Sequence, residues 1–332
     1  MTAGITVRPV DGIGEVRAGD DLAALLVEAT RVDVLADGDV VVLTSKVVSK
    51  AEGRAVSAGR DDVLAGETDR VVARRGRTSI VRTHHGLVPA AASIDASNTG
   101  AGTVLLLPED PDGSARLLRE RLLDQTGRNV AVVVTDTAGR AWRNGQTDVA
   151  IGAAGLEVMH DYAGRIDDYG NELAVTAPAV ADEIAAAGDL VKAKLARRPA
   201  AVLRGLGDLV LPVGEHGPGA AALVREESQD MFGLGAREAV LAALAADPAG
   251  QRGFGSAAPA EEAAGLLGTV AGAAVRVEQE DEAAALVVPL PDLEPRALGR
   301  WEATVAAAAF ALGWVTAGHE TETVLRFRVA TP

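Results

Sequence analysis

The sequence predicts an α+β fold in two parts. Short valine-rich runs alternate along the chain with amphipathic stretches, which is the pattern of mixed strand and helix structure. A length of 332 residues fits two domains at a typical size of about 150 residues each. Pro, Gly, Ala and Ser gather at residues 248–260, so we expect a linker there, with a larger domain at 1–247 and the linker and a smaller module at 248–332.

The larger domain begins with a helix and a strand. Residues 20–30 are amphipathic, with Asp20 in position to cap a helix, and residues 36–46 indicate a tight turn followed by a buried strand. In chain order, the sequence then predicts a helix at 110–127, an apolar strand at 129–136, a helix at 177–196 and a strand at 199–206.

The helix at 110–127 has signals at both ends. Ser114 is expected to cap its start, and Gly127 is expected to end it. Its apolar stripe is expected to consist of Leu117, Leu118 and Leu122.

The chain from residue 249 onward is predicted to form a small α+β module. It contains five of the nine aromatic residues, which we expect to fill a compact core. The expected elements are a helix at 261–274, a strand pair around 274–290, a helix at 300–314 and a last strand at 323–330.

Composition excludes several classes of function. Cysteine is absent, which excludes disulfides, thiolate metal sites and cysteine nucleophiles, and we expect a cytoplasmic protein. A net charge of −15 repels nucleic acid. No apolar run reaches the roughly 18 to 20 residues that a membrane span needs, so neither nucleic acid nor membrane is expected as a partner.

Lysine is rare in this chain and is found in two places. Only four of the 32 basic residues are lysines, namely Lys46, Lys50, Lys192 and Lys194. If the segment TSKVVSK at 44–50 is extended, Lys46 and Lys50 share one face, because side chains in a strand repeat with a period of two. Two ammonium groups on one face suit a polyphosphate, and a solvated edge is the alternative.

The apolar strand at 129–136 is predicted to end in Asp136. A carboxylate there, followed by the Thr137 hydroxyl, is a recurring way to hold a divalent cation against nucleotide phosphates, and a structural turn is the alternative. Arg140 and Arg143 can then meet phosphate or carboxylate oxygens. The chain has no GxxxxGK[ST] loop, which excludes a P-loop GTPase.

A second acidic turn is found at residues 90–102, which are rich in small side chains. Asp95 and Asn98 project from it, and together with Asp136 they are candidates for a two-carboxylate site that suits Mg or Mn better than zinc. A purely structural turn is the alternative. The turn containing residues 11–14 adds backbone N–H donors for an anion. The five histidines lack zinc-ligand spacing.

These segments together resemble the coenzyme F-420-0:L-glutamate ligases, also called gamma-glutamyl ligases. The resemblance covers roughly residues 5–240. The segments that resemble the family, in order, are DGIG (11–14), DGDVVVLTSKVVSKAEGR (37–54), IDASN (94–98), DPDGSA (110–115), VVVTDTAGRAWR (132–143), DYAGRIDDYGNEL (161–173) and ADEIAAAGDLVKAKL (181–195).

The resemblance implies a gamma-glutamyl ligase-like mixed fold that forms an intertwined homodimer. It implies an enzyme that uses GTP and a divalent cation, Mn or Mg, to add L-glutamate to coenzyme F-420-0. The implied nucleotide contacts are Asp11, Gly12, Ile13, Gly14, Thr44, Ser45, Lys50, Asn98, Lys192 and Lys194. The implied metal ligands are Asp95, Asp136 and Thr137, and the implied catalytic residues are Asp136, Lys50 and Arg140.

The chain departs from the family pattern at three places. Lys194 lies where archaeal members have a glycine-rich acidic loop, and it cannot bind a cation, so water, substrate or its own charge must complete the site. Ser93 replaces the usual glycine, and a positive φ there would be strained. The C-terminal 84 residues lack the phosphate clamp of a flavin domain, so no FMN is expected.

Two other functions remain open from the sequence. One is a non-catalytic guanine-nucleotide-binding module, in which the altered segment around Lys194 has abolished phosphoryl transfer. The other is an amide ligase that uses a different acceptor.

Overall fold

The computed structural model describes residues 4–31, 33–97, 99–280, 283–321 and 323–330. The chain forms two compact units, Met1–Val224 and Arg225–Pro332. Both combine helices with sheets, which confirms the predicted α+β class. The units divide earlier than the predicted linker at 248–260, and the functional division at residue 247 stays a prediction.

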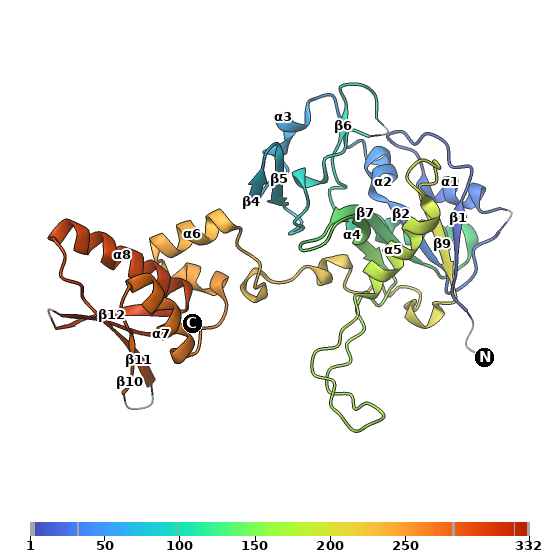
Figure 1. Cartoon of the computed structure of the whole chain (residues 1–332). Coiled ribbons are helices and arrows are strands. Elements are labelled where there is room, and N and C mark those ends of the chain that lie inside the picture. The colour runs from blue at the N-terminus through green and yellow to red at the C-terminus, as the bar shows by residue number, and fades with distance from the viewer. Residues whose placement is uncertain (1–3, 32, 98, 281–282, 322, 331–332) are drawn as a thin grey trace. The chain divides into compact units, whose positions relative to one another are not determined.

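The first unit is built on a five-stranded sheet (Figure 1). The strand pair β2–β7 is parallel and the other three pairs are antiparallel. In spatial order the strands are β1 (Thr6–Val10), β9 (Ala200–Arg204), β2 (Val40–Thr44), β7 (Ala131–Gly139) and β8 (Gln146–Ala154).

Helices cover both faces of this sheet. Val41 and Leu43 pack with α1 (Leu22–Ala29) and α4 (Pro111–Thr126) on one face. Val40 and Val42 pack on the other face with α5 (Val180–Lys192). Since alternate side chains enter different cores, β2 and β7 begin with continuous apolar runs, Val40–Leu43 and Ala131–Val134.

A smaller subdomain lies between β2 and α4 and packs around its own core, which includes Val81 and Ile94. Its elements are α2 (Ser45–Ala51), β3 (Ala55–Val56), α3 (Arg60–Leu64), β4 (Arg70–Arg75), β5 (Thr78–Arg82), the 3-10 turn η1 (Ala91–Ser93) and β6 (Val104–Leu105). Strand β3 pairs with β6, and β4 pairs with β5.

The segment between β8 and α5 is a long loop that extends away from the sheet (Figure 1). Ile166, Tyr169 and Val175 are exposed on it, at 71%, 92% and 92%. The 3-10 turns η2 (Gly207–Leu209) and η3 (Ala220–Leu223) follow β9 and complete the first unit.

The second unit has a four-stranded antiparallel sheet in the order β10-β11-β13-β12. Trp314, Phe310 and Phe327 are buried in its core, which confirms the expectation for these aromatic residues. Its elements are η4 (Glu227–Gln229), α6 (Ala236–Ala245), η5 (Pro248–Phe254), α7 (Ala260–Ala271), β10 (Arg276–Glu280), β11 (Ala283–Pro289), α8 (Pro295–Ala311), β12 (Trp314–Thr321) and β13 (Val324–Val329).

Two predicted helix caps are wrong by one or a few residues. Asp21, not Asp20, caps α1, since its carboxylate accepts the Ala23 and Ala24 N–H groups at 2.9 and 3.2 Å. Helix α4 starts at Pro111, so Asp110 caps it and Ser114 lies inside the first turn.

Two further details of the larger domain differ from the prediction and one agrees with it. Leu117 is 52% exposed and does not share the buried stripe of Leu118 and Leu122. Gly127 ends α4 as expected, with φ 69°. Strand β7 does not end at Asp136 but continues to Gly139, because it pairs with β8 along its whole length.

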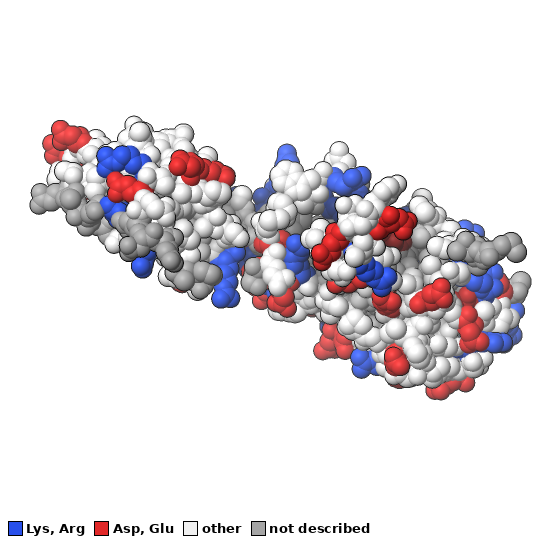
Figure 2. Space-filling model, turned by 90° about the horizontal axis from the view of Figure 1, so that it is seen from below, with Lys and Arg blue, Asp and Glu red and all other residues white. Residues whose placement is uncertain are grey.

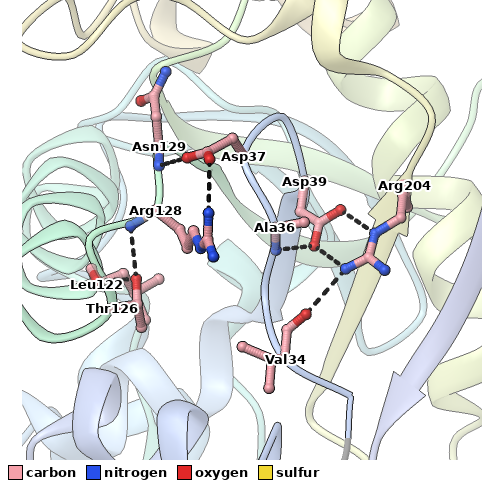
Figure 3. A network of polar contacts seen from close by, with 9 residues as sticks. All are labelled: Val34, Ala36, Asp37, Asp39, Leu122, Thr126, Arg128, Asn129 and Arg204. Carbon is pink, nitrogen blue, oxygen red and sulfur yellow. Dashed lines mark hydrogen bonds and ion pairs between the residues drawn. The ribbon is translucent and has the colours of Figure 1, made fainter.

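A polar network fixes the edge of the sheet where β2 begins (Figure 3). Arg204 at the end of β9 donates two hydrogen bonds of 2.7 Å to the buried carboxylate of Asp39. Asp37 accepts from the backbone N–H of Asn129 at 2.8 Å and from Arg128 at 3.0 Å, and these contacts lower its pKa. This edge is therefore occupied by structural contacts.

Acidic and basic side chains are interspersed on the molecular face in Figure 2, with no large field of one sign. Among the described residues, no helix has the length and apolar character required for a membrane span.

Candidate functional site

The predicted motifs converge at the opposite edge of the five-stranded sheet. Val10 and Leu43 both pair with Ala200, and Thr44 pairs with Thr135. The loop after β1, helix α2, the second half of β7 and the segment before β9 therefore all adjoin this edge. Each of them carries residues that the sequence analysis selected.

Asp95 and Asp136 line one small cavity at this edge, together with Ser45, Lys46 and Ser93. The Lys46 ammonium forms an ion pair with Asp95, and Ser45 Oγ donates a hydrogen bond of 3.0 Å to Asp136 Oδ1. The backbone of Asp95 is held by an isolated bridge to Leu105. Two carboxylates that are distant in sequence are thus brought to one site, although their role as metal ligands stays a prediction.

The two carboxyl groups have pKa values that are shifted in opposite directions. Burial raises the pKa of Asp136, hydrogen bonds from Ser93 and Ser45 oppose that shift, and the nearby charge of Asp148 adds to it. Burial also acts to raise the pKa of Asp95, but the contacts with Lys46 and Ser97 outweigh it, so the pKa of Asp95 is lowered. Neighbouring carboxyl groups whose pKa values are shifted apart are typical of functional sites.

Two lysines neutralise these carboxylates. Burial acts to lower the pKa of Lys46, but the contact with Asp95 outweighs burial and raises it. The pKa of Lys194 is lowered, first by its contact with Lys46 and then by burial, while Asp95 and Asp136 act in the opposite direction. Lys194 is exposed and does not line the cavity, but its charge acts on Lys46, Asp95 and Asp136, which do.

Asp148, which was not predicted from the sequence, lies in β8 directly opposite Thr137. Its carboxylate accepts hydrogen bonds of 2.8 Å from the hydroxyls of Thr135 and Thr137 and one of 2.6 Å from Lys192 Nζ. Lys192 also donates to Thr135 Oγ1 at 2.8 Å. The available signal was a single aspartate directly before the apolar run Val149–Ala154.

Lys192 is 5% exposed, and its ammonium is engaged by this network. Its predicted contact with the nucleotide is untested, but the structure gives it a structural partner. Arg198 also has an acidic partner, since it donates to Asp11 at 2.7 Å. Lys192 and Arg198 are therefore already paired with aspartates, whereas Lys194 interacts with Lys46 near the cavity.

The remaining predicted nucleotide residues lie around the same edge. Gly12 has φ 88°, a conformation that favours glycine, and Ile13 packs against the core. Gly14 is exposed, and the Thr44 N–H donates to Pro199 O at 2.9 Å. Asn98 lies outside the described residues.

Lys50 lies on α2 and forms an ion pair of 2.5 Å with Glu15, beside the loop after β1. The segment 44–50 is not extended, the case considered in the sequence analysis, because Ser45–Ala51 is helical. Lys46 and Lys50 still share a face, since positions i and i+4 of a helix are neighbours. Arg140 is exposed beyond the end of β7, and among the described contacts its guanidinium bonds only to Asn144 O, at 3.4 Å.

The donor set at the cavity suits a hard divalent cation. Asp95 and Asp136 offer carboxylate oxygens there, whereas Thr137 does not line the cavity and its hydroxyl donates to Asp148. Within the described ranges, no group of three or more acidic or histidine side chains could hold a metal ion by itself. Mg and Mn accept such partial sets, because substrate phosphates and water complete their coordination.

The backbone at Ser93 has a positive φ, which is the condition under which the sequence predicted strain. Ala91, Ala92 and Ser93 have φ values of 48°, 54° and 56°, which L-residues rarely adopt. We expect Ser93→Gly to raise the free energy of unfolding by about 1 kcal/mol, because glycine adopts this φ without strain. Urea denaturation measures it, and Ser93→Ala, which keeps the Cβ, is the control; an equal gain in both variants would contradict the strain explanation.

Comparison with known proteins gives a consistent result. Residues 12–205 match the family described as F420-0:Gamma-glutamyl ligase. The chain is 40% identical over 223 residues to a coenzyme F420:L-glutamate ligase of Archaeoglobus fulgidus, covering 61% of this chain and 88% of that protein. It is 40% identical over 226 residues to the same enzyme of Methanothermobacter thermautotrophicus (61% and 89%), and 38% identical over 252 residues to that of Methanopyrus kandleri (69% and 97%).

The matched region spans the loop after β1, the cavity with Asp95 and Asp136, and strand β9. From this match and these identities, the chain belongs to the F420-0:gamma-glutamyl ligase family.

Proposed function

We propose that this protein is a ligase that adds L-glutamate to coenzyme F-420-0 with GTP as the energy source, as a step in coenzyme F-420 biosynthesis. The observation that carries the proposal is the convergence of Asp95 and Asp136 on one cavity at the sheet edge, in a chain of this family. The relatives named above are coenzyme F420:L-glutamate ligases, which supports the acceptor and the amino acid.

The chemistry follows from the substrates. A carboxylate is a poor acyl donor, since its leaving group would be oxide. We propose that an oxygen of the precursor's terminal carboxylate attacks the γ-phosphorus of GTP, which releases GDP and forms an acyl phosphate. The glutamate amine then attacks the carbonyl carbon, phosphate leaves, and the amine proton passes to solvent or to a phosphate oxygen.

The protein's own groups then have defined tasks. Asp95, Asp136 and Thr137 would hold Mg or Mn, which when bound neutralises phosphate charge. Lys46 and Lys194 supply positive charge beside the transferring group, and Lys50 and Arg140 are proposed to hold substrate oxygens. Asp148 fixes the Thr137 hydroxyl proton on the side away from the ligand, so that the lone pairs of Thr137 stay available.

We further propose a homodimer, since the loop between β8 and α5 presents exposed apolar side chains. Ile166, Tyr169 and Val175 on this loop would pack against a second copy. This would account for an extended loop with so little contact to its own sheet.

The proposal is tested with purified protein, GTP, MnCl2, coenzyme F-420-0 and isotope-labelled L-glutamate. We expect one GDP for each glutamyl unit added, measured by mass spectrometry of the product. Nucleotide binding without turnover would favour the non-catalytic module. GDP release that needs a different amino acid or precursor would favour another amide ligase.

A further inference from the structure

The loop between β7 and β8, residues 140–145, presents an aromatic ring to solvent. Trp142 is 89% exposed, whereas Trp314 is 1% exposed and Trp301 donates its indole N–H to Ala271 O at 3.0 Å. A large apolar side chain left in water contributes little to folding. Trp142 therefore needs an explanation other than packing within its own unit.

The backbone of this loop has an unfavourable conformation at Trp142. Trp142 has φ 62°, which is rare for a bulky residue. The loop is closed around it by the Arg143 N–H, which donates to Arg140 O at 3.4 Å, and by Arg140 Nη2, which donates to Asn144 O at 3.4 Å. Strain of this kind is concentrated at ligand-binding sites, because the bound state compensates for it.

The charge beside the ring defines the ligand that the loop can accept. Arg143 is exposed, and in the part of the chain that the structure describes its guanidinium makes no hydrogen bond or ion pair. An indole face stacks on planar aromatic rings, and a guanidinium binds phosphate or carboxylate oxygens. Together they suit an aromatic ring that carries an anionic chain.

The loop is also at a suitable distance from the cavity. Strand β7 continues for three residues beyond Asp136, to Gly139, so the loop begins roughly 10 Å along the strand from Asp136 at about 3.3 Å per residue. The precursor reacts at its terminal carboxylate, and its deazaflavin ring must therefore bind some distance away from the reacting atoms.

We propose that Trp142 stacks on the deazaflavin ring of the acceptor and that Arg143 holds its anionic chain, so that residues 140–145 form the acceptor-docking loop. This inference rests on the proposed function, since it takes the acceptor from it. Stacking contributes to substrate affinity and not to phosphoryl transfer itself.

The test compares Trp142→Ala with Trp142→Phe in the full-length protein. We expect Trp142→Ala to weaken binding of the precursor by about 5- to 100-fold, measured by calorimetry without GTP or metal. In turnover the same factor should appear in KM for the precursor, with kcat and KM for GTP unchanged. Trp142→Phe, which keeps a ring, should restore most of the affinity.

A truncated precursor that lacks the deazaflavin ring separates stacking from a general defect, since Trp142→Ala should leave its KM unchanged. An equal loss for both substrates, or a change from dimer to monomer in light scattering, would overturn the docking role. If the wild-type protein catalyses glutamate addition and Trp142→Ala binds the precursor normally, the inference fails while the proposed function stands. Trp142-dependent binding without any turnover would leave the inference supported and the proposed function rejected.

Discussion

Replacing Asp136 by asparagine is expected to lower kcat for glutamate addition by about 100- to 1000-fold. The side chain keeps its size and its contact with Ser45, but loses the charge that the cavity needs to hold a cation against phosphate. The fold should remain intact, because burial already disfavours the ionised form of Asp136 and raises its pKa. Initial rates of labelled-glutamate incorporation give the measurement, and circular dichroism checks the fold.

Asp124→Asn is the matched control for this variant. Asp124 is exposed on α4, away from the cavity-lining residues, so the same loss of charge should leave kcat unchanged. Wild-type turnover in Asp136→Asn would remove the metal and phosphate role from this residue.

The same raised pKa predicts a pH effect on cation binding. A cation must displace the proton of Asp136, so its affinity falls as the pH drops through the raised pKa, at a higher pH than for an ordinary aspartate.

Replacing Lys192 by methionine is expected to destabilise the protein by about 3–5 kcal/mol. The ammonium and the Asp148 carboxylate are 6% and 4% exposed and lie 2.6 Å apart, so removal of one leaves the other buried without its partner. Urea unfolding of the first unit's sheet, followed by circular dichroism, measures the loss.

The double variant Lys192→Met with Asp148→Asn tests the cause of this loss. It removes both charges and keeps one oxygen acceptor, while the amide NH2 can donate to the other threonine hydroxyl, so it should recover at least half of the lost stability. If the double variant were as unstable as the single one, the packing of the lysine stem and not the ion pair would be the cause.

Much of the fold could be predicted from local sequence patterns. The central strands β2, β7 and β9 and the helices α1, α4 and α5 have strong apolar periodicity, and Gly127 ends its helix as predicted. The strands β4, β5 and β8 were not predicted, because they are polar or alternate weakly, and their pairing depends on contacts with distant residues.

The candidate site was accessible only in part. Asp95 and Asp136 could be selected because each has a local signal, a small-residue turn or the carboxylate after a buried strand. The contacts that surround these two carboxylates could not be predicted from the sequence. Lys46 forms an ion pair with Asp95, and Lys192 forms one with Asp148. Both pairs join elements that are far apart in sequence, so no sequence spacing predicts them.

Formation of an acyl phosphate on the precursor's carboxylate is the central step of the proposed reaction, and isotope labelling tests it most directly. Coenzyme F-420-0 labelled with 18O in its terminal carboxylate is converted with unlabelled GTP and L-glutamate, and the released phosphate is analysed by mass spectrometry. An acyl phosphate predicts that each phosphate carries one oxygen from the carboxylate. Phosphate without label, formed alongside the glutamyl product, would contradict it.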